Sequence, residues 1–321
     1  MRHEGIIIVG AGPIGLAAAI SAKRRGIDPL VIDAGAIVNS IVRYPIQMGF
    51  FTTPELLEIG GHPLVCASGK PTREEALMYY RGVVRTEGLR VDTYTRLVTA
   101  RREGNRISVE TDGIRGPERM TCDRLVLATG YYDNPRPLGV PGEDLPHVSR
   151  YFDEAHRSIG LDVVVIGGKN SAAEAALLLY RAGARVTLVY RGTVFPASLK
   201  YWVRPDLENR IAAGEIAGRL GSVVQRITPR AVVIRDLDGA EESIAADRVF
   251  ALIGYRPDTE LFRRIGIEID DATGRPAHDP ATLETNVPGV FLAGSVTAGY
   301  RTGDIFIENG RFDGERIFAR G

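Results

Sequence analysis

Three closely spaced glycines and one acid near the N-terminus could together hold a dinucleotide. The glycines stand between an apolar run, residues 6–9, and a helical run of small residues, and Asp33 ends a second apolar run. In such a strand, turn, helix and strand, the first glycine allows a tight turn and the second lets the backbone approach a pyrophosphate. The third lets helix and strand pack closely, and the acid can accept the hydroxyls of an adenosine ribose. The predicted site residues here are Gly10, Gly12, Pro13, Ile14, Gly15 and Asp33.

Residues 161–192 repeat the same order of strand, glycine turn, small-residue helix and strand. Lys169 replaces the middle glycine of the ideal turn, and its cation could meet a phosphate. The second strand ends without an acid, and Arg191 could pair with a ribose 2′-phosphate that a carboxylate would repel, which favours NADPH over NADH. The alternative is that Arg191 is a solvated surface residue. The predicted contacts are Gly167, Gly168, Lys169, Asn170, Ser171 and Arg191.

Three later strands end in small residues, as expected where a chain passes close to a nucleotide. Residues 123–135 contain Thr129 and Gly130, residues 247–254 end at Gly254, and residues 285–299 contain Gly294 and Ser295. A helix is expected from about Asp304, with Ile305 near its start, and its positive end could stabilise an anionic group. Residues 36–69 are too long and aperiodic for an idle connection, so Asn39 and Ser40 are expected to contribute hydrogen bonds to the first nucleotide.

The order of these motifs predicts an α/β fold with two tandem Rossmann-like dinucleotide-binding domains. Four prolines between residues 135 and 146 indicate a stiff hinge, and the tail beyond the second unit returns to the first. The expected domains are an FAD-binding domain of residues 1–133 and 256–321, split around an NAD(P)H-binding domain of residues 134–255. Thr72 and Glu75 have the spacing of a capping box, which predicts a helix over 72–86. Residues 89–113 alternate as short strands of a small antiparallel β layer.

Composition excludes several other classes. The chain has 44% apolar and 25% charged residues, and its 40 basic and 40 acidic side chains give no net charge that would attract nucleic acid or a membrane. No apolar run has the length of a bilayer span, and we expect a cytoplasmic protein. Cys66 and Cys122 stand far apart without a CxxC, so neither a metal site nor a redox dithiol is predicted.

Nearly the whole chain resembles the thioredoxin-reductase-like flavoproteins with two dinucleotide domains. The resemblance lies in residues 10–15, in ATG at 128–130, in VPGED at 140–144, and in GGKNSAAEAAL and TNVPGVFLAG. More narrowly, NSIVRYP, FFTTPELLEIGG, LATGYYDNP, VVVIGGKNS and IFIENGRF resemble the bacillithiol-disulfide reductase group, the YpdA-type enzymes. This resemblance implies FAD and NADPH as cofactors, a role in redox homeostasis and a homo-oligomer.

Three departures from the family pattern bear on the chemistry. No cysteine follows VPGED, so electrons cannot pass to thioredoxin through a CxxC. Bacillithiol-type enzymes commonly carry a cysteine inside the first glycine turn, where this chain has Ile14. Many relatives have an aspartate after the last strand, where this chain has Ser295, whose hydroxyl can still bind a ribityl chain.

The sequence therefore predicts a pyridine nucleotide-dependent flavoprotein oxidoreductase without identifying its catalytic residues. Its partner would be a small-molecule or small-protein electron acceptor, with a low-molecular-weight disulfide such as bacillithiol disulfide implied by the resemblance. A ferredoxin or flavodoxin reductase on the same scaffold also lacks cysteines. A flavin monooxygenase binds the same cofactors, and a non-catalytic redox sensor would bind them without turnover.

Overall fold

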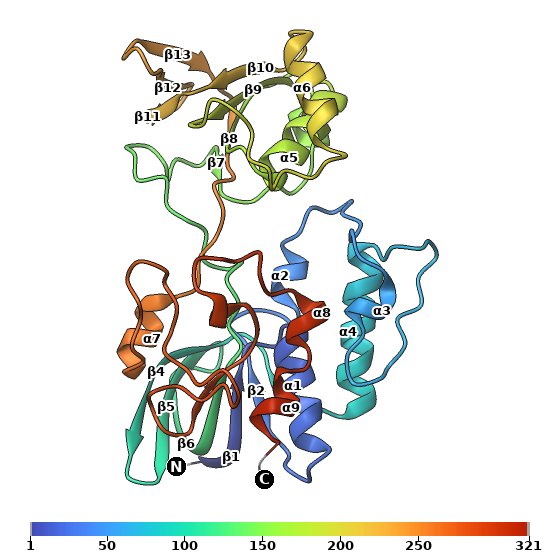
Figure 1. Ribbon diagram of the computed structural model, residues 1–321, viewed down its shortest axis with the longest axis vertical. Coiled ribbons are helices and arrows are strands. Elements are labelled where there is room, and N and C mark those ends of the chain that lie inside the picture. Colours follow the sequence, from blue (N-terminus) through green and yellow to red (C-terminus); the bar gives the residue numbers. More distant parts are fainter. Residues whose placement is uncertain (1, 320–321) are drawn as a thin grey trace. The chain divides into compact units, whose positions relative to one another are not determined.

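A computed structural model describes residues 2–319, whose contacts group them into two units (Figure 1). The first unit holds the described residues up to Arg43, Gln47–Asn134, and the described residues from Tyr255 onward. The second holds Tyr44–Ile46 and Pro135–Gly254. No helix within residues 2–319 has the length and apolar character that crossing a bilayer requires.

The first unit is built on one seven-stranded sheet with the order β3-β2-β1-β6-β5-β4, and β15 also pairs with β6. The long strand β6 is shared by two kinds of pairing, because its first half is antiparallel to β5 and its last residues are parallel to β15. The antiparallel layer expected from residues 89–113 is therefore an extension of the parallel sheet, and its first strand, β3, pairs parallel to β2. The strands are β1 Arg2–Val9, β2 Leu30–Ile32, β3 Arg90–Asp92, β4 Thr95–Glu103, β5 Arg106–Gly113, β6 Glu118–Leu127 and β15 Val290–Leu292.

Helices cover this sheet in patterns that the sequence partly predicts. Helix α4 begins at the expected capping box, in which Thr72 and Glu75 bond each other's backbone N–H. The helix expected from Asp304 is instead two short helices, α8 and α9, separated at Arg311–Phe312, and α9 packs on α1. The helices are α1 Pro13–Lys23, α2 Asn39–Val42, α3 Pro54–Leu57, α4 Arg73–Glu87, α7 Thr259–Ile265, α8 Ile307–Gly310 and α9 Asp313–Ile317, with the 3₁₀ helix η2 at Gly294–Ala298.

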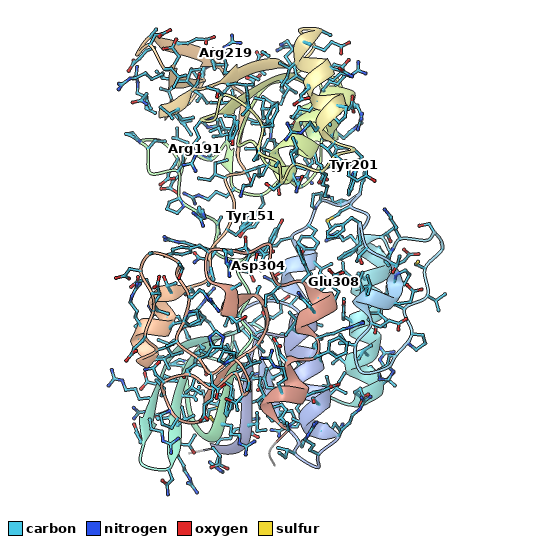
Figure 2. All side chains as sticks on the ribbon, viewed as in Figure 1. Tyr151, Arg191, Tyr201, Arg219, Asp304 and Glu308 are labelled. Carbon is cyan, nitrogen blue, oxygen red and sulfur yellow. The ribbon has the colours of Figure 1, made fainter. Side chains whose placement is uncertain are left out.

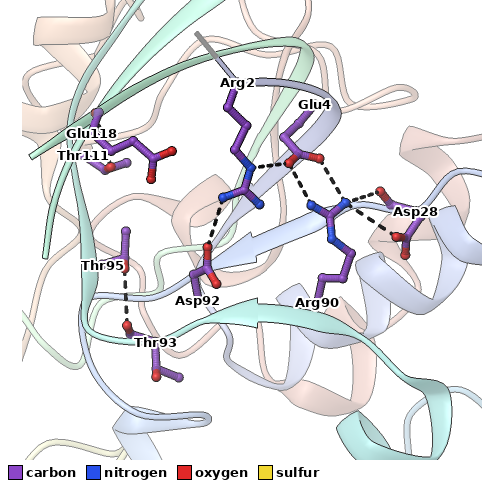
Figure 3. A network of polar contacts seen from close by, with 9 residues as sticks. All are labelled: Arg2, Glu4, Asp28, Arg90, Asp92, Thr93, Thr95, Thr111 and Glu118. Atoms are coloured by element: carbon purple, nitrogen blue, oxygen red, sulfur yellow. Dashed lines mark hydrogen bonds and ion pairs between the residues drawn. The ribbon is translucent and has the colours of Figure 1, made fainter. Parts of the chain in front are cut away.

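An ion network fastens the start of β1 to β3 (Figure 3). The buried carboxylate of Glu4 accepts hydrogen bonds from Arg90 at 2.7 and 3.0 Å and from Nε of Arg2 at 2.7 Å. Arg2 also reaches Asp92 at 3.5 Å, and Arg90 reaches Asp28 at the same distance. Burial alone would raise the pKa of Glu4, but the two guanidinium groups outweigh it and lower that pKa.

The second unit repeats the parallel arrangement with the strand order β10-β9-β8-β14-β7. A three-stranded antiparallel sheet, β11-β12-β13, packs on it and is not predicted by the sequence patterns. The strands are β7 Val148–Ser149, β8 Asp162–Ile166, β9 Arg185–Tyr190, β10 Ala217–Leu220, β11 Val223–Thr228, β12 Ala231–Arg235, β13 Glu241–Ala245 and β14 Arg248–Ala251. The helices are η1 His156–Ser158, α5 Asn170–Arg181 and α6 Arg204–Ala212.

Candidate functional site

Two of the three glycines in the first turn have no room for a side chain, and the third faces open space. Gly10 has φ 111°, and a Cβ there would lie 2.3 Å from the carbonyl oxygen of Ala128. A Cβ on Gly15 would lie 1.9 Å from the carbonyl oxygen of Gly10. At Gly12, the N-cap of α1, no atom lies within 4 Å of such a Cβ. The close packing on β1 and β6 and the open face at the helix N-terminus fit a bound pyrophosphate.

Asp33 follows β2 directly and is held by the turn itself. Its carboxylate accepts the N–H of Ala11 and the N–H of Gly35, both at 2.7 Å. Burial raises the pKa of Asp33 despite these two hydrogen bonds. Because each carboxylate oxygen has lone pairs left, the fixed side chain can still accept ribose hydroxyls.

The end of β6 carries a buried polar atom that lacks a protein partner. Oγ1 of Thr129 is inaccessible to solvent and makes no hydrogen bond within the described residues. The next residue, Gly130, has φ 65° and open space where a Cβ would be. An orphaned buried hydroxyl beside the glycine turn is a position that a bound group would satisfy. The turn, Asp33 and Thr129 together fit the flavin nucleotide expected from the sequence.

Ile14, at the position where the resemblance implies a cysteine, is closely packed. Its Cδ1 lies 2.6 Å from where a Cβ of Gly294 would be, and the same distance from where a Cβ of Gly310 would be. Ile305 approaches the latter position to 3.2 Å. Ser295 is buried within η2. The structure thus brings the predicted residues Gly294 and Ile305 close to Ile14, and Ser295 follows Gly294 in the chain.

Asn39 and Ser40 lie in α2, in the segment that follows the first turn. The amide nitrogen of Asn39 donates to Asp133 at 3.0 Å, and its amide oxygen lies 3.4 Å from the N–H of Ala36. Its side chain therefore links the segment after the first turn to the stretch that follows β6. Ser40 is half-buried.

The structure corrects the expectation of a full helix N-terminus at Asp304. Helix α8 has one turn, and its first residue is Ile307. Phe306 is the N-cap of this helix, so a helix N-terminus does lie at the end of the expected stretch, and the stabilisation of an anion by it stays a prediction. The N–H of Phe306 is bonded to Oδ1 of Asn309 at 2.8 Å.

Sequence reasoning missed Asp313, a buried acid in α9. Its Oδ2 accepts the N–H of Gly294 at 2.7 Å, and its Oδ1 lies 3.1 Å from Arg316. Burial raises its pKa, and those two contacts only partly offset that effect. A carboxylate therefore does reach the end of β15, although Ser295 stands where the resemblance implies an aspartate. The sequence offered no distinctive signal, because Glu315 and Arg316 follow Asp313 in the same short helix.

The turn of the second unit has the same tight geometry. Gly167 has φ 142°, and a Cβ there would lie 2.5 Å from the carbonyl oxygen of Leu252, at the end of β14. Lys169 is the N-cap of α5 and is exposed, as is Ser171. Gly254 has φ 96° and open space around it.

Two predicted residues of the second unit, Asn170 and Arg191, differ in whether their side chains already have hydrogen-bond partners. The side chain of Asn170 is already used, because it accepts the N–H of Lys200 at 2.9 Å and donates to Ser198 at 3.3 Å. Arg191 is exposed and makes no hydrogen bond or ion pair within residues 2–319. By contrast Arg219, in the adjacent strand β10, is paired twice with Glu242, at 2.7 and 2.8 Å. Figure 2 labels both arginines on the second unit.

Neither cysteine has the surroundings of a reactive thiol. Cys122 is fully buried in β6, and burial raises its pKa to about 12. Cys66 is half-exposed in the irregular segment before α4, and its Sγ lies 2.5 Å from the carbonyl oxygen of Ser68. Across the described residues, no group of three or more His, Cys, Asp or Glu side chains could hold a metal ion.

Comparison with known proteins agrees with this geometry. Residues 7–294 match the family described as pyridine nucleotide-disulphide oxidoreductase. The bacilliredoxin reductase Bdr of Bacillus subtilis is 47% identical over 99% of this chain and 98% of its own length. A ferredoxin–NADP reductase of Ignicoccus hospitalis is 30% identical over 91% and 89% of the two lengths.

A solved structure gives the same result in three dimensions. The bacillithiol disulfide reductase Bdr (YpdA) from Bacillus cereus superposes with a TM-score of 0.95 and 44% identity, covering 98% of each chain. The paired glycine turns, the strand ends beside them and these likenesses identify one family. The chain is a flavoprotein oxidoreductase that uses FAD and NADPH and belongs to the pyridine nucleotide-disulphide oxidoreductase family.

Proposed function

We propose that this enzyme uses FAD and NADPH to reduce a small disulfide, the class of acceptor that bacillithiol disulfide represents. In this proposal the first unit binds FAD and the second binds NADPH. The observation that carries the proposal is the pair of glycine turns with different strand ends, an acid at Asp33 and an unpaired cation at Arg191. The likeness to bacillithiol disulfide reductase supports the class of acceptor.

Different residues of the chain would bind different parts of the flavin nucleotide. Asp33 would accept the adenosine ribose hydroxyls, the open face at Gly12 would take the pyrophosphate, and Thr129 would satisfy its buried hydroxyl on the bound group. Ile14 fills the space beside Gly294 and Gly310 with apolar atoms, which excludes water there. When bound, the flavin would accept a hydride from NADPH and deliver two electrons to the acceptor.

The protein supplies no thiol at this position, so the acceptor would meet the flavin without a cysteine relay. A disulfide that takes up two electrons and two protons becomes two thiols, and one NADPH supplies the electrons. No protein disulfide has to form and break in this balance. We also propose a cytoplasmic homo-oligomer.

A panel of acceptors tests the function. The enzyme is reduced anaerobically with NADPH and mixed with bacillithiol disulfide, other small disulfides, ferredoxin, flavodoxin, quinone or oxygen. Fast reoxidation by a small disulfide, with two thiols formed per NADPH, is the expected result. The likeness to a ferredoxin–NADP reductase makes ferredoxin the second candidate. Reoxidation by ferredoxin alone would replace the proposed acceptor, and oxygen incorporation would indicate a monooxygenase.

A further inference from the structure

An aromatic ring covers the second glycine turn, where the first unit has a carboxylate. A methyl group built on Gly168 would lie 2.3 Å from Cδ2 of Tyr190, and one built on Gly192 would lie 2.7 Å from its Cε1. The buried ring of Phe195 lies parallel to the Tyr190 ring, with 5.9 Å between centroids and 9° between planes. Tyr190 is therefore held between two glycines, and Gly168 must lack a side chain to admit it.

Strand register makes Tyr190 the counterpart of Asp33. Val9 pairs with Ile32 in the first unit, and Ile166 pairs with Val189 in the second. Asp33 follows Ile32 in the first unit, and Tyr190 follows Val189 in the second. The first unit joins its turn to its strand end by a hydrogen bond from Ala11 to Asp33. The second joins Gly168 to Tyr190 by ring contact alone.

Two exposed cations adjoin this contact in the chain. Lys169 on the turn and Arg191 after β9 are both exposed, and neither makes an ion pair in the part of the chain described. The half-buried Tyr190 directly precedes Arg191 and contacts Gly168, the residue before Lys169, and it brings no acid. An anionic group approaching here meets two unpaired cations and no carboxylate from the strand end.

We propose that Tyr190 is the positioning residue that makes the second turn specific for a nucleotide with an extra phosphate on its adenosine ribose. The ring holds the Gly168 backbone in place without the carboxylate that would accept a free ribose hydroxyl. Lys169 and Arg191 are then left to the phosphate. This inference rests on the proposed binding of NADPH in the second unit and adds the residue that shapes the site.

Calorimetric titration of the FAD-loaded enzyme with adenosine 2′,5′-bisphosphate and with 5′-ADP tests this role without turnover. The wild type is expected to prefer the bisphosphate. Tyr190→Asp should weaken bisphosphate binding by roughly 10- to 100-fold, the range of a charge-assisted contact, while 5′-ADP binding is kept or improved. Tyr190→Phe, which keeps the ring, should bind both ligands as the wild type does.

A double-mutant cycle ties the effect to the ring contact. Gly168→Ala should displace the Tyr190 ring and weaken both ligands. The same change should have little effect in the Tyr190→Asp background, because the double variant would carry the alanine and aspartate that the first unit has at Ala11 and Asp33. Thermal unfolding of each variant reports whether it is folded. If Tyr190→Asp does not fold, Gly168→Ala against Tyr190→Phe carries the test.

The outcomes separate this inference from the function beneath it. A wild type without preference for the bisphosphate overturns NADPH specificity at this turn, and the role of Tyr190 with it. A wild type that prefers the bisphosphate, with the same preference in folded Tyr190→Asp, overturns the role of Tyr190 alone. Equal effects of Gly168→Ala in both backgrounds would likewise show that the ring does not position the turn.

Discussion

Cδ1 of Ile14 lies 2.6 Å from the place that a Cβ of Gly310 would take, so the first helix and the C-terminal segment meet through a missing side chain. Gly310→Ala should push Ile14 aside, and overpacking of this kind costs about 1–3 kcal/mol of unfolding free energy. Denaturant unfolding measures the cost. Ile14→Val should relieve it in the double variant.

A matched control is Gly82→Ala in the middle of α4, where no atom lies within 4 Å of the added methyl. That change should stabilise the protein by roughly 0.5–1 kcal/mol, because alanine favours the helix. If Gly310→Ala behaved like Gly82→Ala, the contact with Ile14 would not constrain this site.

The first two glycines of the first turn should respond oppositely to a side chain. Gly12→Val points into open space, so the protein should fold normally yet purify without FAD, because the valine takes the room of the pyrophosphate. Gly10→Val meets the carbonyl of Ala128 at φ 111° and should not fold. Absorbance at the flavin band and circular dichroism distinguish the two. Full FAD content in folded Gly12→Val would refute the pyrophosphate position.

Local patterns predicted the parts of the fold that short sequence segments determine. The spacing of a few neighbouring residues is enough to predict the glycine turns, the capped helix α4 and the repeated parallel unit. The break of the last helix follows Gly310, a poor helix former, but the packing of Ile14 against that glycine joins distant parts of the chain and could not be predicted. Likewise Asp313 reaches Gly294, and Tyr190 reaches Gly168, only once the strands and helices are assembled.

Arg191 and Arg219 offer a test of nucleotide preference with a built-in control. Arg191→Ala should raise the KM for NADPH by about tenfold or more and leave that for NADH nearly unchanged, because a charge-assisted contact to the 2′-phosphate is lost. Arg219→Ala removes a guanidinium already paired with Glu242, so both KM values should stay close to the wild type. Equal effects of Arg191→Ala on the two nucleotides would contradict its assigned role.

The ion network at Glu4 should make the free energy of unfolding depend on pH in the acidic range. Its pKa is lowered in the folded protein, so its contribution is present above the unfolded pKa and is lost as the pH falls through the folded value. Glu4→Gln should cost about 1–3 kcal/mol at pH 7, since two arginines lose a buried partner, and should flatten the decline in acid. The test is to measure the unfolding free energy of both proteins between pH 3 and 7, at steps of about one pH unit.

Glu110 is the matched control for that network. It pairs with Arg119 at 2.8 Å, but both side chains are about half exposed, so Glu110→Gln should change stability by less than about 1 kcal/mol. A comparable loss in both variants would show that burial of Glu4 does not matter.

Removing both cysteines tests whether the enzyme needs a thiol of its own. A working relay requires an accessible thiolate, whereas the pKa of Cys122 is raised to about 12 by burial and Cys66 is bonded to a backbone carbonyl in a loop. Cys66→Ser with Cys122→Ala should therefore keep both anaerobic bleaching of the flavin by NADPH and turnover with a disulfide. Ile14→Cys in this background places one thiol between Gly294 and Gly310, and alkylation before and after reduction would detect it. Normal bleaching with complete loss of disulfide turnover in the double variant would demonstrate a cysteine relay, and direct transfer to the acceptor would have to be abandoned.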